Sequence, residues 1–135
     1  MRQTLWAALL TLGLCSGCSA PDAELPRAYR NLEIPVARLA DPAARERGRA
    51  LFVAHCAHCH GERADGHGER RAALTRPPAD FTSRAWRQRT SPRRTLWIVR
   101  EGLQGTPMPA WKGTLTETQS WDLVAFVLSV SQESR

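Results

Sequence analysis

Apolar residues recur at helical spacing in three segments of this chain, and no segment shows sustained alternation of apolar and polar residues. The three segments span about residues 41–54, 91–102 and 116–130. Alternation with a period of two would indicate strands, whereas a period near 3.6 indicates helices that bury one face. The pattern therefore predicts an all-α domain whose helices are joined by long loops.

Capping residues fix where the three predicted helices begin. The first two helices are predicted to begin at Asp41-Pro42 and Ser91-Pro92. In each pair, the first side chain can accept hydrogen bonds from the free amides of the first turn, and the proline suits the first helical position. Gly102 is a natural stop for the second helix. The third begins at Thr116-Glu117-Thr118-Gln119, a capping-box pattern.

The first 40 residues differ from the rest in composition. Arg2 followed by the apolar run 5–14 reads as a signal peptide over residues 1–17, because about 10 apolar residues are too few to span a bilayer. Residues 18–40 contain three prolines without a clear period. We expect them to form a tether that spans roughly 25 Å as a coil.

A cysteine at the end of the apolar run suggests a lipid anchor. Ser16-Gly17-Cys18 resembles the lipobox of bacterial lipoproteins, in which Cys18 would become the lipidated first residue. Cys15 departs from that pattern, which usually has leucine there. Ordinary cleavage after Ala20 is the alternative, although Pro21 makes that site poor. We expect a periplasmic protein anchored to a bacterial membrane through Cys18.

The net charge of +6 raises the question of nucleic-acid binding, but the distribution of charge argues against it. Lys112 is the only lysine among 19 basic residues, and the arginines form no long run. No nucleic-acid-binding motif accompanies the charge. A basic surface that helps to dock an acidic redox partner fits the sequence better.

The strongest chemical signal is Cys56-Ala57-His58-Cys59-His60, a CxxCH motif that attaches c-type haem. The two thiols would form thioethers with the haem vinyl groups, and His60 would bind the iron from the same turn. A zinc site would need a second ligand pair, and no second CxxC or HxxxH follows. A thioredoxin-like redox pair would follow a strand, whereas this motif follows a predicted helix.

The second axial ligand is expected far downstream. Met108 is the only methionine after Met1, and prolines flank it in Pro107-Met108-Pro109. These prolines hold the backbone extended, which suits a ligand loop better than core packing. The rival ligands are His55, His58 and His67.

These features together resemble the class I cytochrome c family over most of the chain after the first 40 residues. Gly48 and Phe52 in the first helix, with Leu123 and Phe126 in the last, match the family's pattern where these two helices cross. The resemblance implies a class I cytochrome c domain over residues 41–133. Its fold would be all-α, with about three to five short helices around one covalently bound haem c.

The resemblance also suggests supporting residues. The stretch 76–81 is similar to the loop whose proline carbonyl accepts a hydrogen bond from the proximal histidine, which points to Pro77 or Pro78. Trp111, with Trp86 and Trp97, is a candidate to line the haem, although most tryptophans simply fill cores.

The sequence therefore predicts an electron carrier rather than an enzyme. With His60 and Met108 bound, the iron would have no open position, and the thioether would favour Fe(II). Its partners would be a redox donor and an acceptor protein. The alternative is a cytochrome c subunit of a larger membrane dehydrogenase or oxidase complex. A haem enzyme or gas sensor would require a vacant or replaced distal ligand.

Overall fold

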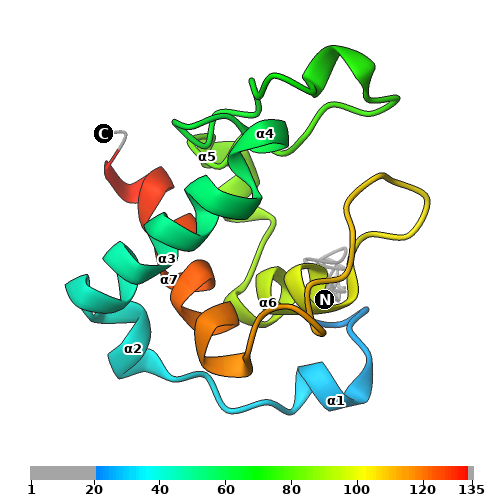
Figure 1. The fold of residues 1–135 in the computed structure, drawn as a ribbon. Helices are drawn as coiled ribbons and strands as arrows, with labels where there is room; N and C mark the ends of the chain where they lie inside the picture. Colours follow the sequence, from blue (N-terminus) through cyan, green and yellow to red (C-terminus); the bar gives the residue numbers. More distant parts are fainter. Residues whose placement is uncertain (1–20, 134–135) are drawn as a thin grey trace, which may run out of the picture.

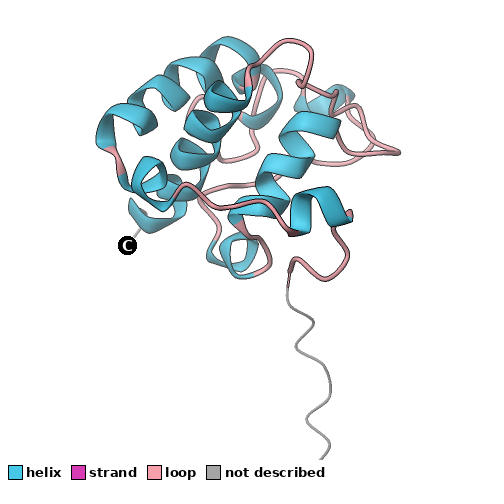
Figure 2. Ribbon diagram, turned by 90° about the horizontal axis from the view of Figure 1, so that it is seen from below, coloured by secondary structure: helices cyan, strands magenta, loops and turns pink. Residues whose placement is uncertain are grey.

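A computed structural model describes residues 21–133, and helices joined by loops make up this part of the chain (Figure 1). It contains no strand, as Figure 2 shows, so the predicted all-α class is confirmed. Its elements are α1 (Arg27–Arg30), α2 (Val36–Ala40), α3 (Pro42–His55), α4 (Ala57–His60), the 3-10 helix η1 (Arg71–Ala73), α5 (Arg84–Gln88), α6 (Pro92–Glu101) and α7 (Glu117–Glu133). The helices outnumber the three to five expected, because several are single turns of four or five residues.

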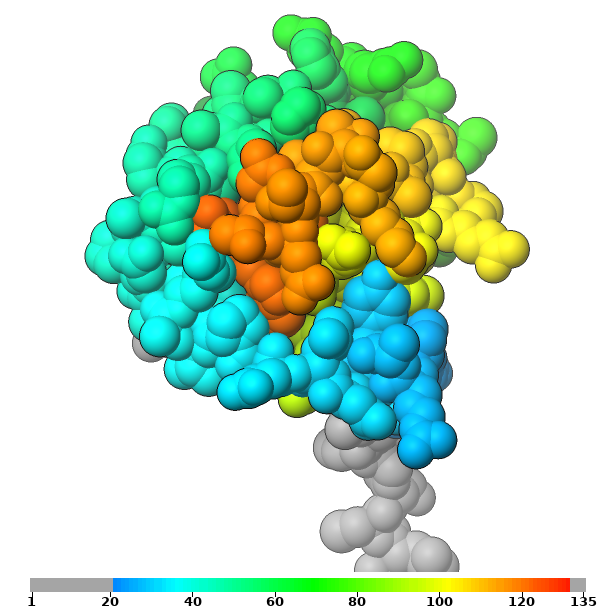
Figure 3. Space-filling view, turned by 60° about the horizontal axis from the view of Figure 1, so that its bottom comes forward, coloured from blue at the N-terminus to red at the C-terminus, as the bar shows by residue number. Residues whose placement is uncertain are grey.

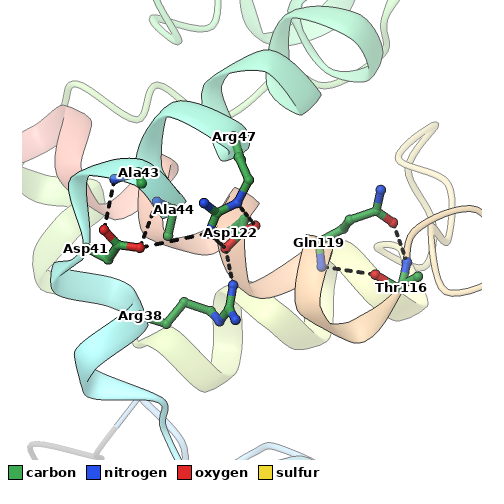
Figure 4. A network of polar contacts seen from close by, with 8 residues as sticks. All are labelled: Arg38, Asp41, Ala43, Ala44, Arg47, Thr116, Gln119 and Asp122. Carbon is green, nitrogen blue, oxygen red and sulfur yellow. Dashed lines mark hydrogen bonds and ion pairs between the residues drawn. The ribbon is translucent and has the colours of Figure 1, made fainter.

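The three long helices begin where the capping residues predict. The Asp41 carboxylate accepts from the amides of Ala43 and Ala44 at 3.0 and 3.2 Å, and Ser91 Oγ accepts from the Arg94 amide at 2.9 Å. Ahead of α7, Thr116 and Gln119 form both hydrogen bonds of a capping box, as Figure 4 shows.

Helices α3 and α7 pack directly against each other and form the centre of the fold (Figure 1). Gly48 allows this approach, because a β-carbon at that position would lie 2.0 Å from the Asp122 carbonyl oxygen. One turn further along α3, Phe52 packs on Phe126 with ring centroids 5.2 Å apart. Phe52 and Leu123 are almost fully buried and anchor the core on which the functional site is built.

An ion-pair cluster around the buried carboxylate of Asp122 joins the same two helices to the N-terminal segment. Asp122 is 4% exposed and accepts from Arg38 Nη1 at 2.6 Å and from Arg47 Nε at 2.8 Å (Figure 4). Burial alone would raise the pKa of Asp122. The hydrogen bonds from the two arginines outweigh burial and hold that pKa below its ordinary value.

Residues 21–40, which we name the N-terminal strap, differ from the predicted tether. They lie along the surface against α6 and α7 rather than extending away (Figure 3). Leu25 is 3% exposed, Tyr29 donates to the Glu101 carboxylate and Asp22 accepts from Ser91. The prediction failed because the segment's apolar residues are widely spaced and pack against a surface that only the fold creates.

Within residues 21–133, no helix combines the length and apolar character needed to span a bilayer. The predicted signal peptide and Cys18 lie outside the described residues.

Candidate functional site

The CxxCH segment forms a tight turn immediately after α3. Cys56 caps the end of α3, and its carbonyl oxygen accepts from the amides of Cys59 and His60 at 3.1 and 2.9 Å. This turn is the start of α4, so both cysteines and His60 are held within one short helical unit. Both thiols are free, and both line the same cavity.

The Cys56 thiol does not have the chemistry of a reactive redox cysteine. Burial, and secondarily the neighbouring Cys59 thiol, raises the pKa of Cys56 to about 12. Reactive CxxC cysteines have a lowered pKa, because the thiolate is the nucleophile. No group of three or more His, Cys, Asp or Glu side chains converges as a metal site anywhere in residues 21–133.

The imidazole of His60 is oriented by a backbone carbonyl and an aromatic ring. Its Nδ1 lies 3.2 Å from the Ala79 carbonyl oxygen, and its ring stacks on Phe81 with centroids 4.7 Å apart. Because a carbonyl only accepts, Nδ1 carries the proton and Nε2 keeps a free lone pair. Burial lowers the pKa of His60 even though the Ala79 contact raises it, so the ring is neutral at pH 7. A neutral imidazole with a free Nε2 is the form that binds iron.

This contact corrects one prediction. The carbonyl that accepts from His60 belongs to Ala79, and not to Pro77 or Pro78. The loop was identified correctly, but the chain reaches the imidazole one residue after the second proline. Every residue has a carbonyl group, so the side-chain pattern alone carried no signal for Ala79.

A largely apolar cavity of about 330 Å³ lies beside the CxxCH turn. Its lining includes every predicted site residue of the described chain: Cys56, Cys59, His60, Pro77, Pro78, Met108 and Trp111. The structure thus brings together residues that are up to 55 positions apart in the sequence. Their roles as thioether-forming, axial and supporting residues stay predictions.

Met108 is positioned by the loop that follows α6. Its amide donates to Thr106 Oγ1 at 3.2 Å, and its carbonyl accepts from the Leu103 amide at the same distance. Gly102 has a φ of +75°, and a β-carbon there would lie 2.8 Å from the Met108 carbonyl oxygen. This glycine therefore ends α6 and lets the methionine loop fold back over it.

The rival ligands divide into two groups. His55 lines the same cavity as Met108, where its ring lies 5.2 Å from that of Trp111. His58 and His67 instead line a separate hollow that contains acidic side chains of the loop 61–69. The structure brings Met108, but not His67, to the cavity that contains the CxxCH residues.

Only two of the three candidate tryptophans line the cavity. Trp86 and Trp111 line the cavity, whereas Trp97 is not among its lining residues. The indole Nε1 of Trp111 is buried and has no hydrogen-bond partner among the described residues. A buried donor without an acceptor is costly.

These observations fit a covalently bound haem. The cavity is mostly apolar, and two free thiols and a neutral imidazole line it. Cys56 and Cys59 would hold the group covalently, and His60 Nε2 would bind its iron.

Comparison with known proteins agrees with this chemistry. Residues 43–127 match the family model of cytochrome c oxidase, cbb3-type, subunit III. The cbb3-type cytochrome c oxidase subunit FixPc of Rhizobium leguminosarum bv. viciae is 33% identical over 90 residues, which are 67% of this chain and 29% of that protein.

A solved structure shows the same fold at lower identity. It is the Kuenenia stuttgartiensis reducing HAO-like protein complex Kustc0457/Kustc0458, with a TM-score of 0.59 and 24% identity over 67% of this chain and 44% of that chain. The chain thus spans less than half the length of each of these two proteins. The family match itself covers more than half of this chain and includes the CxxCH turn, the residues that line the cavity and the first part of α7. The chain therefore belongs to the family of cbb3-type cytochrome c oxidase subunit III, and it is a c-type cytochrome in which covalently bound haem transfers electrons.

Proposed function

We propose that this chain is a monohaem electron carrier of the class I type, with His60 and Met108 as its two axial ligands. The observation that carries the proposal is the single cavity lined by both CxxCH cysteines, His60 and Met108. The sequence holds one CxxCH motif, which gives one haem per chain.

Four of the lining residues have a direct part in this function: Cys56, Cys59, His60 and Met108. When bound, haem supplies an iron that alternates between Fe(III) and Fe(II). Cys56 and Cys59 fix its position, and the Ala79 carbonyl holds His60 in the tautomer that donates Nε2. The Met108 thioether would also bind the iron and would favour the reduced state. The apolar lining excludes water, which also favours the lower charge of the reduced site.

A redox titration of the exported holoprotein tests the proposal. One haem per chain, a single one-electron wave and the weak sulfur-to-iron band of the oxidised protein are expected. Two haems per chain, or rapid carbon monoxide binding by the unmodified reduced protein, would contradict a six-coordinate monohaem carrier.

A role as a subunit of a larger redox complex is the second candidate, and the names of the relatives favour it. One relative is an oxidase subunit, and the solved structure is a protein complex. Purification from native membranes under mild detergent would separate the two candidates. A free carrier elutes alone, whereas a subunit elutes with a stoichiometric set of partner chains.

We also propose that the protein is periplasmic and lipid-anchored through Cys18, with a signal peptide over residues 1–17. The support is Ser16-Gly17-Cys18 after an apolar run. Mass spectrometry of the mature N-terminus tests this directly. Diacylglyceryl-modified Cys18 is expected, and an unmodified N-terminus beyond Cys18 would refute the anchor.

A further inference from the structure

The positive charge of this protein is concentrated in one segment. Residues 21–133 contain 17 basic and 13 acidic residues, a net charge of +4. Residues 70–90, which we name the basic segment, contain six arginines and one aspartate, a net charge of +5. The rest of the described chain holds 11 basic and 12 acidic residues, a net charge of −1.

The arginines of the basic segment have no acidic partner within the described part of the chain. Arg38, Arg47 and Arg93 elsewhere each pair with an aspartate. The segment's six arginines form no ion pair in the described part of the chain: Arg70, Arg71, Arg76, Arg84, Arg87 and Arg89. All of them are exposed except Arg87, which is half-buried. The carboxylate of Asp80 is occupied by the amide and hydroxyl of Thr82. The charge of the segment is therefore available to an external partner.

The basic segment is also one wall of the functional cavity. Its lining includes Leu74, Arg76, Pro77, Phe81 and Trp86 of this segment. Two of these lining residues, Arg76 and Pro77, are also exposed to solvent. The cavity wall therefore reaches the surface at Arg76 and Pro77. In Figure 1 this segment lies at the end of the molecule opposite α1 and α2.

We propose that the basic segment is the docking surface for an acidic face of a redox partner protein. Docking there brings the partner to the rim of the cavity at Arg76 and Pro77. This inference rests on the proposed electron-carrier function. Arginine favours such a partner, because its planar guanidinium pairs with carboxylates through two hydrogen bonds. An anionic membrane on the same surface would cover the rim and block electron exchange with a protein.

Electrostatic steering makes the proposal measurable. A surface of one charge raises the association rate with a complementary surface by roughly 10- to 1000-fold, and salt removes the effect. The probe is a gold electrode coated with a carboxylate-terminated monolayer, which presents an acidic surface to the holoprotein.

The test compares two triple variants that lose the same charge. R71Q/R84Q/R89Q removes three arginines of the basic segment that do not line the cavity. R27Q/R30Q/R49Q removes three exposed arginines elsewhere. At low salt, we expect the first variant to lose about tenfold in adsorbed, electroactive protein, and the control to match the wild type. Equal losses in both variants would overturn the proposal, because net charge alone would then explain adsorption.

Two further measurements keep the result interpretable. Redox titration in solution should give the same midpoint potential for all three proteins, so that a failure of the haem site is not mistaken for a failure of docking. Binding to phosphatidylglycerol vesicles tests the other anionic surface. The proposal would be overturned if vesicle binding depended on these arginines while electron exchange with the electrode did not. The segment would then be assigned to a membrane.

Discussion

At the scale of single residues, His60 and Met108 are held by different means. His60 is fixed by the Ala79 carbonyl and the Phe81 ring, whereas Met108 is fixed through its own backbone by Leu103 and Thr106. A substitution of the Met108 side chain should therefore leave the loop in place. This separation makes Met108 a suitable position at which to test ligation.

The Met108→Ala variant should lose the weak sulfur-to-iron band and bind carbon monoxide faster than the wild type. Its midpoint potential should fall by on the order of 0.1 V, within the roughly 0.8 V range that axial ligands control. Met108→His should also lower the potential but keep the iron six-coordinate. Unchanged spectra and potential in Met108→Ala would show that Met108 only packs.

Asp122 makes the second prediction at this scale, a pH dependence of folding. Its folded pKa lies below its unfolded value, so its contribution to stability is complete above about pH 4 and is lost as the pH falls through the folded pKa. Asp122→Asn should lower the free energy of unfolding at pH 7 by about 2 kcal/mol and flatten this acid dependence.

Denaturant unfolding at pH 7 and pH 3.5 measures both effects of Asp122→Asn. The control is Glu33→Gln, which removes an exposed carboxylate that forms no ion pair in the structure. An equal loss in the two variants would contradict a specific role for the cluster around Asp122.

At the scale of the elements, capping residues and helical periodicity were enough to locate α3, α6 and α7. The short helices α1, α2, α4 and α5 show no periodicity, because one turn is too short to show a period and is stabilised by contacts made elsewhere. The same limit applies to the site. The residue types of CxxCH and the methionine loop predicted side chains that line one cavity, whereas the acceptor for His60 is a backbone atom that no residue type encodes.

The contact between α3 and α7 gives a prediction of its own. Gly48→Ala should lower the free energy of unfolding by more than about 2 kcal/mol, because the added methyl group meets a helix backbone that cannot rotate away. Gly113→Ala is the matched control, since a β-carbon there has no neighbour within 4 Å. Thermal or denaturant unfolding compares them, and equal stabilities would contradict the close approach at Gly48.

At the scale of the whole molecule, the cavity is enclosed largely by loops that contain little regular structure. Residues 61–83 and 102–116 contribute much of its lining and include only the short η1. Loops of this length need something to pack against. We therefore expect folding to depend on the bound haem.

The Cys56→Ser/Cys59→Ser double variant tests this dependence. Acid and organic solvent should extract any haem from it, and the exported protein should show reduced helical circular dichroism and rapid proteolysis. Each single variant should keep one thioether and an intermediate stability. Free extraction of haem from the wild type would contradict covalent attachment.

The N-terminal strap also changes how an anchored protein would stand on its membrane. Because Asp22 is already fixed to Ser91, only the four steps from Cys18 to Asp22 separate a lipidated N-terminus from the folded domain. Four residues reach at most about 14 Å, which is far less than the predicted tether would allow. A lipidated Cys18 would therefore hold the domain close to the bilayer with a restricted orientation, and partners would have to approach it at the membrane surface.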